Sequence, residues 1–207
     1  MSEKEEALRQ ISEIKSHLVD RETFFPYNYN ACYVWSIIAF ILTVVMIPSY
    51  QYSILFGAVL TFVLMMLGFL IEGSMTKKVN QEYDIDDVTK RQQFIMMFFT
   101  MIALFSTLLS ASLAIYKLYP LIYFLWLFLI SLGYFTVGFI LNIERFSRVA
   151  QFNMLTAMVL LVVGLYFNLF IEDSSSFMLL IQGVMILGLT ILPAWVAWHQ
   201  KKAECSV

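Results

Sequence analysis

The chain has 207 residues, of which 60% are hydrophobic and 14% are charged, with a formal net charge of −2. Soluble domains carry about 25% charged residues, so a chain this apolar is expected to lie in lipid. The charge balance gives no indication of nucleic-acid binding, and the sequence contains no Gly-rich phosphate loop and no Cys/His set with metal spacing.

The first 30 residues are polar and predict a cytoplasmic amphipathic helix followed by an aromatic interfacial linker. Four apolar residues recur there at intervals of four, three and four, which places them on one helical face: Ala7, Ile11, Ile14 and Leu18. This stripe is a candidate partner-binding or self-association face. The alternative is that it lies on the protein's own cytoplasmic loops or on lipid headgroups.

Residues 31–198 contain five long stretches without Asp, Glu, Lys or Arg, and the first is long enough for two spanning helices of about 20 residues each. Pro48 is expected to end the first helix, because proline lacks an N–H and clashes with the preceding turn. The sequence therefore predicts an all-α, polytopic membrane protein whose six transmembrane helices form three hairpins. The expected helices are 31–48, 52–71, 93–116, 119–142, 151–171 and 177–198.

Lys and Arg are enriched in short cytoplasmic loops, and this bias predicts the orientation. With a cytoplasmic N-terminus, twelve of the 13 basic residues lie inside and only Lys117 lies outside. Both termini, including the tail 199–207, are thus predicted to be cytoplasmic, in a plasma or inner membrane. The largest predicted loop, 73–92, faces the same side.

The predicted helix cores contain no ionisable residue, and Glu72, near the end of the second helix, is expected to face the headgroup interface. Amides in hydrocarbon need hydrogen-bond partners, so four of them are candidates for interhelical bonds or for a polar path: Asn142, Asn153, Asn168 and Gln182. Ser106, Ser110 and Ala114 lie four residues apart and form a candidate helix-packing face.

No catalytic constellation is present, and the two histidines, His17 and His199, do not form a haem or metal pair, so no enzyme activity and no cofactor are predicted. The favoured interpretation is a non-catalytic membrane module. It would couple to a cytoplasmic protein, or self-associate as a homo-oligomer, through the N-terminal helix and the 73–92 loop. The alternative is a pore or permease subunit for a neutral or weakly polar solute, driven by a separate ATPase, which rests on six-helix architecture alone.

Overall fold

A computed structural model describes residues 6, 9–11, 28–82, 89–141, 143–170 and 175–204 of the chain. The helices within these ranges are α2 (Tyr29–Tyr52), α3 (Ile54–Glu82), α4 (Lys90–Ile115), α5 (Tyr119–Ile140), α6 (Glu144–Tyr166), α7 (Ser175–Met185), a π-helical segment η1 (Ile186–Ile191) and α8 (Leu192–Glu204). The last three elements form one continuous span, which gives six helices long and apolar enough to cross a membrane. The predicted all-helical membrane fold is confirmed at this level.

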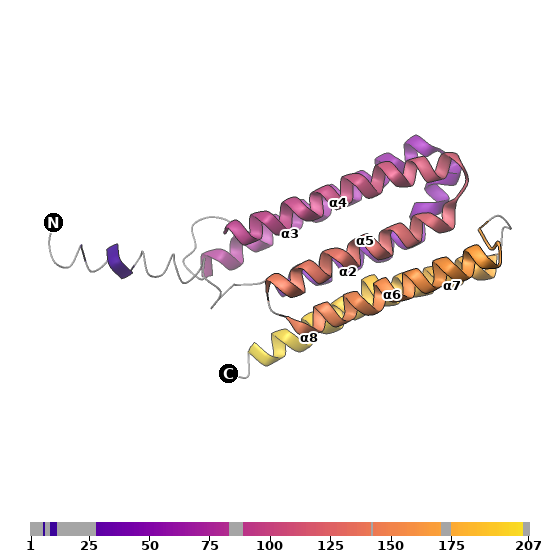
Figure 1. Cartoon of the computed structure of the whole chain (residues 1–207). Helices are drawn as coiled ribbons and strands as arrows, with labels where there is room; N and C mark the ends of the chain where they lie inside the picture. Colours follow the sequence, from indigo (N-terminus) through magenta and orange to yellow (C-terminus); the bar gives the residue numbers. More distant parts are fainter. Residues whose placement is uncertain are drawn as a thin grey trace.

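The helices form three layers, in which α3 and α4 lie on one side, α2 and α5 in the middle, and α6, α7 and α8 on the other (Figure 1). Successive spans run in opposite directions, so the start of α2 lies at the same end of the bundle as the end of α8. We call this the polar end, because Asn28, Asn80 and Gln92 are buried there. The outward surfaces are apolar, as lipid contact requires, with Leu55 on α3 and Val162 on α6 among the exposed residues.

α3 is longer than its apolar stretch predicts, and α6 is displaced toward the start of the chain, running from Glu144 to Tyr166 rather than over 151–171. α3 was expected to end at 71 but continues to Glu82, and its 29 residues give about 43 Å at about 1.5 Å per residue, more than the ~30 Å of hydrocarbon. α6 was expected to start at 151 but starts at Glu144, whose carboxylate pairs with Arg148 one turn later. Charged residues mark where a helix leaves lipid, which is not where helical structure must end.

An amide pair fixes the extended part of α3 to the start of α4. Asn80 Nδ2 donates to Gln92 Oε1 and Gln92 Nε2 donates to Asn80 Oδ1, each at 2.8 Å. Thr89 caps α4, since its hydroxyl accepts from Gln92 N–H while Gln92 Oε1 accepts from Thr89 N–H. Much of the segment predicted as a loop, 73–92, is therefore helical, and hydrogen bonds join its two helical parts.

Pro48 lies inside α2 and does not end it, contrary to expectation. The helix continues for one more turn, in which the Ser49 hydroxyl donates to the Val45 carbonyl at 2.6 Å. The chain turns at Ser53, which has extended backbone geometry. Pro48 cannot supply an N–H to the carbonyl of Val44, and the Ser49 hydroxyl bonds to the next carbonyl along the helix, that of Val45.

The π-helical segment η1 interrupts the last span just before Pro193. A proline in an α-helix would clash with the carbonyl four residues earlier, here that of Leu189, and it has no N–H to offer. In the wider turn the N–H of Leu192 bonds to the carbonyl of Leu187, five residues back. Pro193 thus gives a physical reason for the π segment.

Candidate functional site

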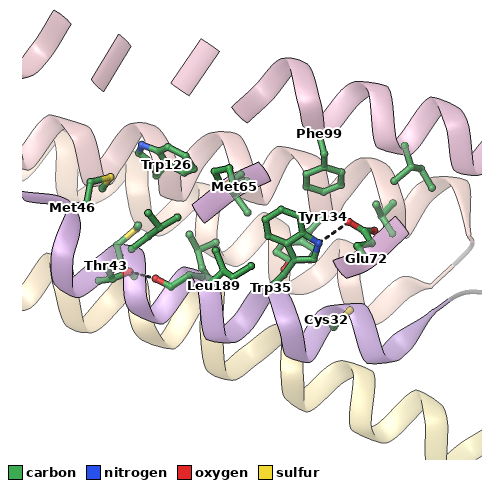
Figure 2. Close-up of a pocket in the computed structure, with 17 residues that line it drawn as sticks. Cys32, Trp35, Thr43, Met46, Met65, Glu72, Phe99, Trp126, Tyr134 and Leu189 are labelled. Atoms are coloured by element: carbon green, nitrogen blue, oxygen red, sulfur yellow. Dashed lines mark hydrogen bonds between the residues drawn. The ribbon is translucent and has the colours of Figure 1, made fainter. Parts of the chain in front are cut away.

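The middle of the bundle contains an elongated cavity between α2 and α5, closed on its other sides by α3, α4 and the last span (Figure 2). Its wall is almost entirely aliphatic and aromatic, with a single carboxylate at one end. Residues on its wall are Cys32, Trp35, Ile38, Ala39, Leu42, Thr43, Met46, Met65, Glu72, Ile95, Phe99, Trp126, Ile130, Tyr134, Val137, Met185 and Leu189.

The α2 side of the cavity is one helical face. Cys32, Trp35, Ala39, Leu42 and Met46 follow one another at intervals of three or four residues, so they line up along the helix axis. From the first to the last of them α2 rises about 21 Å. The cavity therefore runs along much of the bundle rather than forming a round hollow.

The free space in the cavity is narrow. The centres of water-sized molecules can occupy about 70 Å³ of it, several times the ~10–15 Å³ that one water requires. If this space were spread evenly over about 21 Å, its radius would be about 2.4 Å once the ~1.4 Å radius of water is added, which is about the width of one alkyl chain.

Glu72 sits at the polar end of this cavity. Its Oε2 accepts a hydrogen bond from Trp35 Nε1 at 2.7 Å (Figure 2). The Trp35 ring is held by an edge contact with Phe69, whose centroid is 5.0 Å away, and it passes over Gly68, where a Cβ would lie 2.8 Å from the indole. The sequence placed Glu72 at the headgroup interface, whereas the structure places its carboxylate on the cavity wall with an indole partner.

Polar residues continue beyond Glu72 toward the end of the bundle. Asn28 Nδ2 donates to Thr76 Oγ1 at 3.4 Å, and Lys201 Nζ donates to Asn30 Oδ1 at 3.1 Å. The carboxylate thus lies at the boundary between an apolar channel and a polar layer. An amphiphilic molecule in the channel would have its head at this boundary.

A hydrogen-bonded chain crosses the bundle next to the other end of the cavity. Gln182 Nε2 donates to Tyr123 Oη, which donates to the Thr43 carbonyl, each at 2.8 Å. This chain joins α7, α5 and α2. Gln182, one of the four amides singled out from the sequence, therefore makes an interhelical contact beside the cavity wall rather than on it.

The small face of α4 packs inside the chain, where Ser106, Ser110 and Ala114 are all buried. Trp126 Nε1, from α5, donates to Ser110 Oγ at 2.8 Å, and that hydroxyl donates to the Ser106 carbonyl at 2.6 Å. The bond orients Trp126, whose ring forms part of the cavity wall. This face therefore contacts the cavity indirectly, through Trp126.

Two other candidate amides, Asn153 and Asn168, stabilise the backbone rather than line the cavity. Asn153 is buried, and its Nδ2 donates to the Gly188 carbonyl in η1 at 2.9 Å. In an i→i+5 ladder that carbonyl would need the N–H of Pro193, which does not exist, so the Asn153 side chain takes its place. Asn168 is exposed after the end of α6 with φ 56°, a left-handed conformation that asparagine tolerates better than most residues.

The remaining sequence candidates fall mainly outside the described residues. Asn142 lies outside them, as do Ala7, Ile14 and Leu18 of the N-terminal stripe. Ile11 is helical and 61% exposed. The amphipathic helix and its binding face stay predictions.

No family model, curated protein or solved structure matched the chain.

Glu72 and the aromatic rings near it give the cavity wall groups that can bind a ligand. Among the described residues no three His, Cys, Asp or Glu side chains come together as a metal site. Glu72 can accept hydrogen bonds or hold a cation, and the aromatic rings near it can pack on apolar or cationic groups. The pairing of Trp35 with Glu72 could not be predicted from the sequence, because the two residues are 37 positions apart. One sequence feature of the cavity wall was visible beforehand, the spacing of three and four residues along the α2 face. This spacing is common to any packed helix and does not identify a binding site.

Proposed function

We propose that this protein is a membrane-embedded binding protein that holds one alkyl chain of an amphiphilic molecule between its helices, with the polar head at Glu72. The observation that carries the proposal is the channel itself, apolar along its length and closed by a carboxylate at the polar end. Ligand sites are mostly apolar with a few convergent polar groups, which is the composition found here.

The proposal is tested with the full-length chain in bilayer nanodiscs of a double-chained phosphatidylglycerol, whose head group carries no ammonium. A background with Trp195→Phe and Trp198→Phe leaves Trp35 and Trp126, which both lie on the cavity wall. Trp126 is only 4% exposed, so a quencher dissolved in the surrounding lipid cannot reach it. A single-chain probe brominated at the end of its alkyl chain should quench the combined emission of Trp35 and Trp126 with saturation.

Two matched substitutions on α2 separate the cavity from the lipid surface. Ala39→Phe places a ring in the channel and should abolish the saturable quenching, whereas Ile37→Phe adds bulk on the exposed side and should leave it unchanged. A folded Ala39→Phe protein that is quenched as well as the parent would refute the proposal. So would the absence of any saturable quenching in the parent.

Coupling to a cytoplasmic protein is a second candidate function. It is favoured by the hydrogen bonds that join the end of α3 to the start of α4. The Asn80–Gln92 pair and the Thr89 cap hold the end of α3 and the start of α4 in a defined shape. Lys77 and Lys78 are exposed on the end of α3. Native mass spectrometry of the complex from cells, for the parent and for Lys77→Glu combined with Lys78→Glu, tests this function. A second polypeptide that is lost with the double substitution would support it, and the absence of a bound polypeptide in the parent would contradict it.

The three-hairpin arrangement is a further proposal, supported by the opposite directions of successive spans (Figure 1). The cytoplasmic location of the polar end is another, supported by the distribution of Lys and Arg. In right-side-out cells a membrane-impermeant maleimide should label Lys117→Cys and not Lys77→Cys. The reverse labelling would place the polar end outside.

A further inference from the structure

We infer that the head group held at Glu72 is an ammonium, because a carboxylate and three aromatic rings converge at the polar end of the channel. This inference rests on the proposed function and adds the chemical class of the ligand. The ligand would be a single-chain alkylammonium compound. Its ammonium could come from a free amine or from a zwitterionic lipid head.

The charge of the site is the first observation. Among the described residues of the cavity wall, Glu72 is the one charged side chain. Trp35 Nε1 donates to its Oε2, and within the described part of the chain no donor to Oε1 is seen. A carboxylate in apolar surroundings is stabilised most by a cation, so the occupant expected next to Oε1 carries positive charge.

The aromatic rings are the second observation. Trp35, Phe99 and Tyr134 surround the carboxylate end of the channel (Figure 2). Phe99 and Tyr134 meet edge to face, with centroids 6.3 Å apart and planes at 69°. Ring faces carry partial negative charge and attract ammonium groups, most strongly when the site is shielded from water.

Other head groups fit this end less well. An anionic head would face a carboxylate, and no Lys or Arg among the described wall residues could offset the repulsion. A neutral hydroxyl could donate one hydrogen bond to Oε1 but would leave the negative charge without a counter-ion. Both the charge and the rings therefore select a cation.

The experiment is a competition in the same nanodiscs and the same tryptophan background, with the brominated probe displaced by three molecules that share a decyl chain. Decyltrimethylammonium is the cation, decanol is the neutral molecule and decylphosphocholine is the zwitterion. Each is titrated against the parent, Glu72→Gln, and the control Glu82→Gln, which changes an exposed carboxylate on the same helix. Glutamine keeps the size of Glu72 and can still accept from Trp35.

The cation should displace the probe from the parent and from Glu82→Gln at about tenfold lower concentration than from Glu72→Gln, while decanol acts equally on all three. Decylphosphocholine showing the same Glu72 dependence would identify a lipid head as the source of the ammonium, and its failure would identify a free amine. Equal displacement by the cation in the parent and Glu72→Gln would overturn the inference. The binding function would stand in that case, because saturable quenching by the probe tests it separately.

Discussion

Gly138 provides a sharp test of how closely α5 and α6 pack. A Cβ built on this residue would lie 2.5 Å from the Ser147 hydroxyl oxygen and 2.7 Å from the Ser147 backbone nitrogen. The carbonyl of Ile143 would be 3.1 Å away. Two of these three neighbours are backbone atoms, which cannot move aside by rotating a side chain. Gly138→Ala should therefore push the start of α6 away from α5.

The expected magnitude comes from two opposing terms. Alanine in a helix is favoured over glycine by about 0.5–1 kcal/mol. Overpacking typically costs about 1–3 kcal/mol, and contact with backbone favours the upper part of that range. The free energy of unfolding should thus fall by about 1–2 kcal/mol. Gly73→Ala is the matched control, because its Cβ would meet nothing within 4 Å and only the favourable term applies.

Thermal unfolding of the parent and the two variants, in one detergent at one protein concentration, measures the difference. Gly138→Ala should unfold below the parent and Gly73→Ala at or above it. If Gly138→Ala proves as stable as Gly73→Ala, the close approach of α5 and α6 described above is incorrect.

Three further predictions concern buried bonds and one strained residue, all measured by unfolding under those same conditions. Asn153→Ala should cost about 1–2 kcal/mol, since the Gly188 carbonyl loses its donor; an unchanged stability would contradict that bond. Asn168→Val should cost about 1–2 kcal/mol because a β-branched residue resists φ 56°, whereas Asn168→Gly should be tolerated, and equal stability of the two would argue against the turn. Trp126→Phe and Ser110→Ala should show a coupling of about 0.5–1.5 kcal/mol in a double-mutant cycle, and purely additive effects would refute their hydrogen bond.

The number and nature of the spans could be predicted from sequence because hydrocarbon imposes a single requirement on about 20 residues at a time. The helix ends could not, since a helix can continue into water. Residues up to Glu82 show this: Lys77, Lys78 and Glu82 are compatible with helix but not with lipid. Pro48 and Pro193 show a second limit, because both prolines lie within helical spans, and Pro193 follows a π-helical segment in which the Asn153 amide donates to the Gly188 carbonyl.

The candidate site was less predictable. Gln182 and Asn153 were singled out because an amide in a membrane needs a partner, and the structure gives both partners on other helices. Trp35 and Glu72 were not paired, because their contact depends on how α2 packs against α3 around Gly68. Tertiary pairing of this kind leaves no periodic signature along the chain.

The π segment also has a consequence for the evolution of this chain's length. A π turn accommodates one residue more than an α turn, so deleting one residue within 186–191 would restore regular helix and leave the faces of α7 and α8 pointing as before. A deletion elsewhere in the last span would rotate everything after it by about 100° and turn Val196 and Ala197, now buried, away from the bundle. Relatives one residue shorter are therefore expected to carry their gap here, together with the loss of Pro193.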